Sequence, residues 1–174
     1  MVKKEIAVKY TERGFAQDAE QAMRGDVIRG LIELITNCDD AYGVKSGAIR
    51  ILVTRPSDAK DFVELAVSDS AKGLTPDEME KAFTFLGAEL SGFAEGESVR
   101  GLFGRGSKDT AWFGRTVFEA IKNGVLTVIV LNRDGKGTME YLDATANDYL
   151  RLGLKHGENG LTARMQVSPQ RARV

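Results

Sequence analysis

Three polar side chains fall on one side of the segment that reads as the first long helix. Glu33, Asn37 and Asp40 are separated by four and then three residues. At about 100° per residue their directions lie within an arc of about 60°, so the three side chains converge on one face. Carboxylate and amide oxygens suit Mg²⁺, and a glutamate beside them could orient and deprotonate an attacking water. The same pattern also fits an ordinary solvated helix face.

A second group of candidate residues follows the apolar run FVELAVS. Asp69 stands directly after this run, and Gly73 comes four residues later. A carboxylate at a strand end can accept a hydrogen bond from an exocyclic amine such as adenine N6. A glycine nearby lets the backbone pack closely against a flat ring. The same residues are also common in ordinary turns.

A glycine-rich segment provides the third and most specific group. Gly101, Gly104 and Gly106 fall within six residues and lead into a predicted helix. Glycines let backbone amides turn toward an anion, and a helix start adds partial positive charge. Three neighbouring side chains could add donors: Arg105, Ser107 and Lys108. The spacing GxxGxG differs from the Rossmann GxGxxG, and the order Gly-Ser-Lys differs from the Gly-Lys-Ser ending of a P-loop.

Together the three groups resemble the GHKL superfamily, which includes gyrase-type topoisomerases, heat-shock-90 chaperones, histidine kinases and mismatch-repair ATPases. The family's helix motif, ExxxNxxDA, is complete from Glu33 to Ala41, and its lid motif, GxxGxG, is complete from Gly101 to Gly106. Its adenine motif, DxGxG, is matched at Asp69 and Gly73, with Ala71 in place of the first glycine. The resemblance covers residues 25–167, and FGRGSKD is most similar to the chaperone and microrchidia-like branch.

The resemblance implies a role for each matched position. Glu33 would be the base that activates water, and Asn37 would be the Mg²⁺ ligand. Asp40 would be a polar group near the nucleotide. Asp69 would bind the adenine amine, with Gly73 at the border of the ring.

A family threonine that supports the adenine contact has two candidate matches here. Thr162 lies near the start of a late strand, one residue out of step with the family's Gly-Thr pair. Gly137–Thr138 matches the pair itself but fits the order of strands less well. By resemblance, Thr162 would belong to the nucleotide site.

The resemblance further implies an Mg²⁺-dependent module that binds and hydrolyses ATP, with residues 87–106 closing as a lid. It implies a nucleotide-driven switch, an ATP-dependent homodimer and a following domain in a longer protein. Two alternatives stay open. One is a histidine-kinase-like catalytic domain that phosphorylates a separate protein. A self-contained kinase is not expected, because His156 is the only histidine and no long dimerising helix carries it. The other is an ATP-gated binding module without hydrolysis.

Helices must carry the first and third groups. Apolar residues recur through 27–41 at the spacing of one helix face, opposite the polar face, and Gly43 suits the C-terminal end. Thr75 and Pro76 read as an N-cap and a first helical residue. The predicted helices cover residues 17–42, with a possible break near Gly25, 75–85 and 107–123, the last closed by Asn123–Gly124.

Strands must carry the second group. The predicted strands cover residues 4–9, 48–54, 62–68, 125–131, 138–143 and 161–167, while residues 144–158 fit no single pattern. The turn NRDGKG indicates a hairpin. Helices and strands mix without a regular βαβ rhythm, which predicts an α+β fold with helices on one face of a sheet. The resemblance implies a two-layer α/β sandwich with a mixed, mostly antiparallel sheet.

Length and composition favour one globular domain. The 174 residues are 43% hydrophobic and 28% charged, which suits a single domain over 1–167 with a tail or linker at 168–174. The net charge of −1 gives no indication of nucleic-acid binding. Cys38 is the only cysteine, so it is expected to be a small buried core residue. Since no apolar run approaches the length of a membrane span, a cytoplasmic protein is expected.

Overall fold

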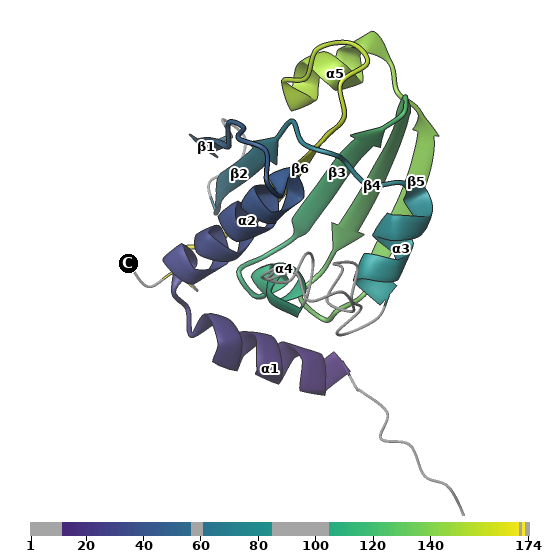
Figure 1. The fold of residues 1–174 in the computed structure, drawn as a ribbon. Coiled ribbons are helices and arrows are strands. Elements are labelled where there is room, and N and C mark those ends of the chain that lie inside the picture. Colours follow the sequence, from purple (N-terminus) through teal and green to yellow (C-terminus); the bar gives the residue numbers. More distant parts are fainter. Residues whose placement is uncertain (1–11, 57–60, 85–104, 171, 173–174) are drawn as a thin grey trace, which may run out of the picture.

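The computed structural model describes residues 12–56, 61–84, 105–170 and 172 (Figure 1). In chain order the elements are α1 (Glu12–Met23), α2 (Val27–Tyr42), β1 (Arg50–Thr54), β2 (Val63–Asp69), α3 (Pro76–Thr84), α4 (Arg105–Asp109), the 3₁₀ helix η2 (Thr110–Trp112), β3 (Thr116–Lys122), β4 (Val125–Leu131), β5 (Gly137–Asp143), α5 (Ala146–Leu152) and β6 (Gly160–Val167). The predicted strand at 4–9 and most of the predicted lid, 87–104, lie outside the described residues.

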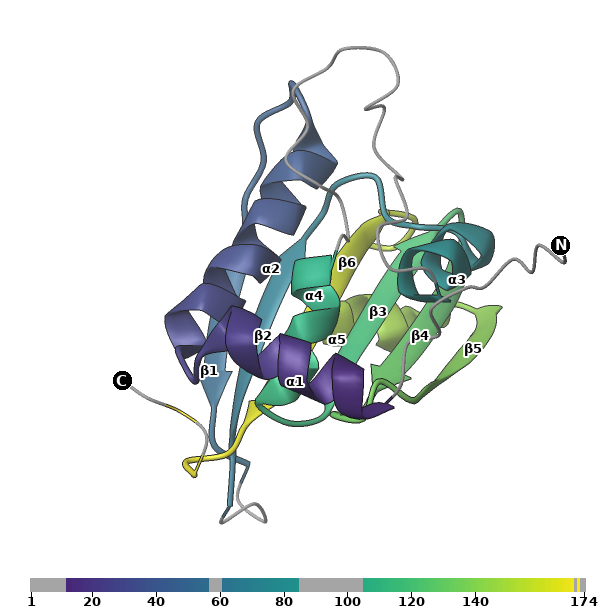
Figure 2. The same ribbon diagram turned by 90° about the horizontal axis from the view of Figure 1, so that it is seen from below.

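The six strands form one sheet in the order β1-β2-β6-β3-β4-β5. Every neighbouring pair among them is antiparallel, so the expected mixed sheet is an antiparallel one in the described part of the chain. Helices α1 to α4 lie over one face (Figures 1 and 2). The predicted α+β class and its two-layer arrangement are confirmed.

The first predicted helix divides into α1 and α2 at the position expected from the sequence. Arg24 and Gly25 both have positive φ, 53° and 73°, which ends α1. Asp26 then caps α2 by accepting a hydrogen bond from the Ile28 amide at 2.9 Å. Gly43, at φ 60°, ends α2. The break turns α1 across the end of α2, as Figure 2 shows.

Helix α2 packs its apolar side on the middle of the sheet. Leu34 and Cys38 are each 2% exposed and belong to the main core with residues of β2 and β6. At Gly30 a side chain would stand 3.1 Å from Phe113 and 3.3 Å from Met165, so glycine allows the close approach. This close packing fixes the distance between α2 and the sheet, and with it the position of the polar side of α2.

The predicted helix over 107–123 is wrong beyond its first turns. Five residues form α4 and three form η2, and the chain then enters β3, a central strand between β4 and β6. Asn123 and Gly124 do not end a helix. Their φ angles of 52° and 82° make the two-residue turn between β3 and β4. The segment TVFEAIK forms a strand because it pairs with β4 on one edge and β6 on the other. The local residue pattern does not reveal this pairing.

Residues 144–158, which the sequence left undecided, contain α5. Thr145 and Asp148 form a reciprocal capping box at its start. The helix packs on Ile121 and Leu126 through a second, smaller core. Because side chains alternate along β3, Ile121 points away from the main core that holds Phe118, so α5 covers the opposite face. The expectation that all helices share one face is therefore wrong for α5.

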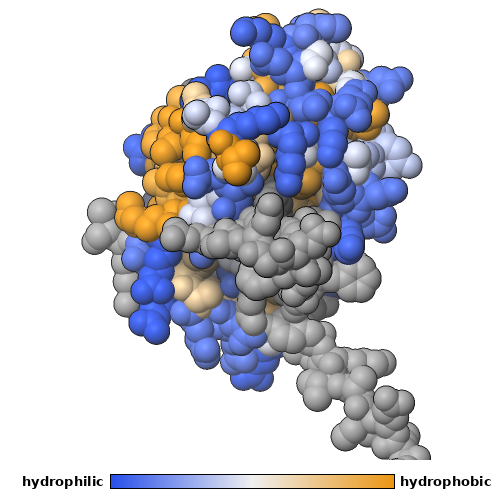
Figure 3. All heavy atoms as spheres, viewed as in Figure 1, coloured by the Kyte–Doolittle hydropathy of each residue, from blue (hydrophilic) through white to orange (hydrophobic). Residues whose placement is uncertain are grey.

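Large apolar side chains are exposed along β1 and the neighbouring side of α2, on the left of Figure 3. They include Ile51, Leu52 and Val53 on the strand and Ile28 and Ile32 on the helix. Strand β1 is an edge of the described sheet, which accounts for its exposure. No helix within the described ranges is both long enough and apolar enough to cross a membrane.

Gly73 generates a stability prediction. Its φ is +58°, and a Cβ there would lie 2.3 Å from the Ile121 carbonyl oxygen and 3.2 Å from the Gly160 amide, both backbone atoms. We expect Gly73→Ala to lower the free energy of unfolding by about 2–5 kcal/mol, about 1–2 from the left-handed backbone and about 1–3 from overpacking. Urea denaturation measures this change.

The matched control is Gly124→Ala. Gly124 also has a positive φ, +82°, but nothing lies within 4 Å of the added carbon. This variant should lose only about 1–2 kcal/mol. Equal losses for the two variants would show that the close packing of Gly73 on β3 contributes nothing.

Candidate functional site

The three sequence motifs converge on the helical side of the sheet. Asn37 on α2 bonds Ser107 on α4, and Glu33 on α2 lies against Gly106. A small cavity between α2 and the end of β2 places Asn37 beside Asp69. Described residues of all three motifs thus lie around α2, although they are far apart in the sequence.

A buried hydrogen bond joins the helix motif to the end of the glycine-rich segment. Asn37 Nδ2 donates to Ser107 Oγ at 2.7 Å, across 70 residues of sequence. Asn37 is 6% exposed and Ser107 is 1% exposed. The amide group uses its nitrogen in this bond, so its carbonyl oxygen points away from Ser107.

Glu33 lies directly over the last glycine of the motif. A Cβ on Gly106 would stand 2.1 Å from Glu33 Oε2, so the absence of a side chain makes room for the carboxylate. Glu33 is exposed and, with Arg29 and Asp109, lines a cavity of about 290 Å³ between α1, α2 and α4. The carboxylate is therefore open to water and close to the start of α4.

Asp69 ends β2 as a buried carboxylate, 5% exposed. Its Oδ1 accepts a hydrogen bond from the Ala71 amide at 2.9 Å. Burial raises the pKa of Asp69, against the lowering effect of the Ala71 amide and of nearby Lys72.

Alanine at position 71 fits the loop after Asp69 without strain. Among the described non-glycine residues, positive φ occurs only at Arg24 and Asn123. Ala71 is therefore outside the left-handed region that would favour glycine. Gly73, by contrast, needs to be glycine, because its φ is positive and its Cα faces the β3 backbone.

The cavity beside Asp69 is small. Its volume is about 10 Å³, roughly room for one water. Besides Asp69 and Asn37, its lining consists of Ala41, Lys72, Gly73, Leu74 and Leu161. The walls combine one carboxylate with mostly apolar groups, and a flat ring would enter only after they move apart.

Lys108 turns from α4 toward α3. It is 3% exposed, and its Nζ lies 5.8 Å from the centre of the Phe83 ring. Burial lowers the pKa of Lys108 to about 8, while the charge of Asp109 acts in the opposite direction. A buried ammonium therefore stands on the same short helix as Ser107.

The remaining predicted residues differ in what the structure describes. Asp40 is half-buried on the polar face of α2, one turn beyond Asn37. Arg105 begins α4. Gly101 and Gly104 lie outside the described residues.

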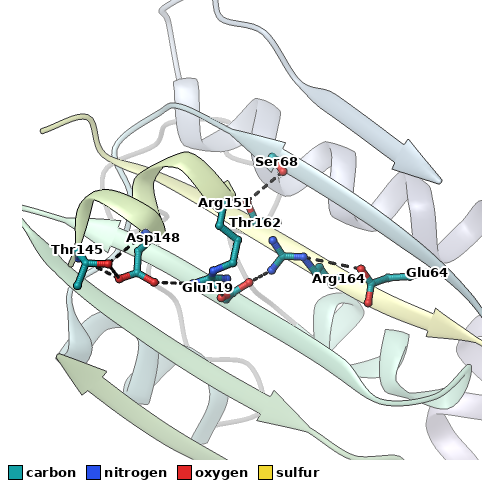
Figure 4. A network of polar contacts seen from close by, with 8 residues as sticks. All are labelled: Glu64, Ser68, Glu119, Thr145, Asp148, Arg151, Thr162 and Arg164. Carbon is teal, nitrogen blue, oxygen red and sulfur yellow. Dashed lines mark hydrogen bonds and ion pairs between the residues drawn. The ribbon is translucent and has the colours of Figure 1, made fainter. Parts of the chain in front are cut away.

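The side chain of Thr162 lies outside the candidate site, so its predicted assignment to the nucleotide site is corrected. Its hydroxyl donates to Ser68 Oγ at 3.0 Å on the sheet face opposite the cavity (Figure 4). In the β2–β6 register Ser68 pairs with Thr162, whereas Asp69 pairs with Leu161. Because side chains alternate, Leu161 rather than Thr162 faces the cavity. The other candidate, Thr138, is exposed on the edge strand β5.

The opposite sheet face carries an ion-pair network instead (Figure 4). Glu119, 4% exposed, pairs with Arg151 of α5 and with Arg164 of β6. Arg164 Nε also lies 3.9 Å from Glu64. Burial lowers the pKa of Arg164, with the charge of Glu64 opposing this. The network ties α5 to the sheet and lies away from the cavity.

One residue near the site was not predicted to contribute to it. Tyr42, at the end of α2, accepts a hydrogen bond from the Ser70 amide at 3.0 Å and donates to the Ala48 carbonyl at 2.8 Å, which fixes the loop after Asp69. Cys38 is buried in the core, as predicted.

No family model matches this chain, and no curated protein matches it. Within the described part of the chain, no cluster of three or more His, Cys, Asp or Glu side chains could hold a metal ion alone. A metal here would need oxygen ligands from a bound molecule or water in addition to Asn37.

The Asn37–Ser107 bond can be tested by a double-mutant cycle. We expect Asn37→Ala and Ser107→Ala each to destabilise the protein, because each leaves a buried polar partner. The double variant should lose less than the sum of the two, with a coupling free energy of about 0.5–1.5 kcal/mol in urea denaturation. Additive losses would mean that the two side chains do not interact in solution.

Proposed function

We propose that this chain is an Mg²⁺-dependent ATP-binding and ATP-hydrolysing module of the GHKL type. The observation that carries the proposal is the Asn37–Ser107 hydrogen bond, which brings the ExxxNxxDA helix against the end of the GxxGxG segment. Asp69 of the adenine motif lies beside Asn37 on the same cavity. Spatial convergence of three separately recognised motifs is a stronger argument than any one motif.

The Asp69 end of the site suits adenine. A carboxylate accepts from the 6-amino group of adenine, whereas the 6-oxo group of guanine would meet it as a second acceptor. Leu74 and Leu161 offer apolar surface to a ring, and Gly73 lies in the same wall. Because the cavity holds about one water, base binding requires its walls to separate.

The α4 end of the site suits phosphate. Lys108 supplies a positive charge and Ser107 a hydroxyl, both on the short helix that follows the glycines. The carbonyl oxygen of Asn37 would hold Mg²⁺ together with phosphate oxygens and water, as Mg²⁺ prefers. Bound Mg²⁺ would neutralise phosphate charge during hydrolysis.

Glu33 is the proposed general base. It lies one helical turn from Asn37, is exposed to water and touches Gly106. A carboxylate in this place can orient a water and take its proton as the water attacks phosphorus. A homodimer formed on ATP binding and a following domain remain part of the proposal.

The alternative of a kinase that modifies its own histidine has little support. His156, the only histidine, is exposed and packs against Tyr149 of α5, with ring centres 5.1 Å apart. Helix α5 covers the sheet face opposite the proposed ATP site. Phosphorylation of a separate protein stays an alternative, as does an ATP-gated module without hydrolysis.

Glu33→Ala tests hydrolysis. We expect ATP affinity to stay within about 3-fold and turnover to fall about 10²–10⁴-fold, the usual contribution of a general base. Calorimetry gives the affinity, and phosphate release gives the turnover.

Asp39→Ala, an exposed acidic position on the same helix, is the control and should retain turnover. Equal turnover in Glu33→Ala and wild type would remove Glu33 from this role. ATP binding without phosphate release by the wild type would favour the ATP-gated alternative.

Asp69→Asn tests base recognition. Loss of a hydrogen bond to a charged group costs about 1.5–3 kcal/mol, so we expect ATP affinity to fall roughly 10- to 150-fold. Calorimetric titration with ATP and with GTP should show that discrimination between them also falls. Unchanged ATP affinity would contradict the assignment of Asp69.

A further inference from the structure

The edge strand β1 and the adjoining flank of α2 carry a group of exposed apolar side chains (Figure 3). Four of them are between 46% and 62% exposed: Ile28 on α2 and Ile51, Leu52 and Val53 on β1. Single exposed apolar side chains are ordinary, but a contiguous group of them marks an interaction surface. We call these four residues, with the part-buried Ile35 of α2, the β1 surface.

The β1 surface lies on a different flank of α2 from the candidate site. At about 100° per residue, Ile35 lies within about 20° of Ile28 around the helix, whereas Glu33 lies about 140° away from Ile28. On β1, Ile51 pairs with the core residue Val67 of β2, so its side chain points to the sheet face that α2 covers. A partner bound here would contact strand and helix together and would leave Glu33 open.

The two edges of the described sheet differ in their protection against strand pairing. Edge strands are usually protected by charged side chains or proline. Strand β5 carries two acidic residues, Glu140 and Asp143. Strand β1 carries one charged residue, Arg50, and its Nη2 already donates to the Leu152 carbonyl oxygen of the same chain at 2.7 Å. The uncharged residues 51–53 therefore make β1 the edge that is open to another strand.

The residue order of β1 suits a second copy of the same strand. If two β1 strands pair antiparallel about a two-fold axis at Leu52, Ile51 of each copy lies opposite Val53 of the other, and Leu52 meets Leu52. Arg50 then lies opposite Thr54, so no like charges meet across the strands. Cross-strand pairs of apolar, β-branched side chains stabilise such a ladder. The net charge of −1 adds little repulsion between copies.

We propose that the β1 surface is a symmetric dimer interface, through which two copies of this chain join their sheets edge to edge. The two-fold axis stands perpendicular to the sheet, so both α2 helices lie on the same face, beside the joined strands. Ile28 of each copy then covers the Ile51–Val53 pairs. The contact buries on the order of 1,000 Å² over the two copies, at the low end of specific interfaces, so we expect a dissociation constant in the micromolar range.

This dimer does not depend on the proposed ATPase function. The β1 surface and Glu33 lie on different flanks of α2, so the interface forms without nucleotide and leaves the candidate site accessible. It is therefore distinct from a homodimer that ATP binding would drive.

Sedimentation velocity of the whole chain, over a concentration series without nucleotide, tests the interface. The wild type should shift from monomer to dimer as its concentration rises. Leu52→Lys places two lysines opposite each other at the axis and should raise the dissociation constant at least about 10-fold. Leu142→Lys is the matched control, because Leu142 is a 48% exposed leucine on the other edge strand, and it should dimerise like the wild type.

A charge-swap mixture tests the position of the two-fold axis. Leu52→Glu alone should dimerise as poorly as Leu52→Lys. An equimolar mixture of the two variants should associate at least about 10-fold more tightly than either alone, because the opposite charges then meet across the axis. Both substitutions replace an exposed side chain, and circular dichroism checks that each variant is folded.

Three results would overturn this interface. The first is a wild type that stays monomeric throughout the concentration series, as it would if a different protein or a following domain covers the β1 surface. The second is a wild type that dimerises only with Mg²⁺ and ATP, which would assign the dimer to the nucleotide-driven switch instead. The third is an equal loss of dimer in Leu52→Lys and Leu142→Lys, or no recovery in the charge-swap mixture. None of these results affects the assignment of the nucleotide site.

Discussion

The hydrogen bond between Asn37 and Ser107 is the constraint on which the arrangement of the site depends. Both side chains are nearly excluded from solvent, and an unpaired amide or hydroxyl there would be costly. Their pairing at 2.7 Å fixes α4 against α2. Because Gly106 precedes Ser107, the same contact brings the glycine under Glu33. One bond therefore sets the distance between the proposed base and the proposed phosphate end.

The sheet separates two chemically different surfaces. On the helical face Asp69 and Leu161 are neighbours across β2 and β6, and the cavity forms beside them. On the other face the next pair in the ladder, Ser68 and Thr162, bonds through its hydroxyls. Behind that pair, Glu119 and its arginine partners hold α5. The proposed recognition surface rests on a sheet that carries helices on both faces.

Much of the scaffold was predictable because its signals are local. The break before α2, its end at Gly43, the cap at Thr75 and the β4–β5 hairpin all appear as the sequence predicts. The structure of segment 107–123 was not predictable in this way, because strand pairing on both edges of β3 overrides its helix-compatible composition. The position of α5 was also beyond reach, because strand alternation alone does not say which face a later helix will cover.

By itself, the sequence determined which residue types share the polar face of α2 and which glycines precede α4, because helix period and glycine spacing are local properties. Only the tertiary structure decided that Asn37 reaches Ser107 and that Lys108 turns toward Phe83. It also decided that Thr162 points away from the cavity, because the β2–β6 register pairs Thr162 with Ser68 and Leu161 with Asp69. The physical reason is that register and interhelical contacts arise from pairing between distant segments, and a shift of one residue reverses the face of every side chain in a strand.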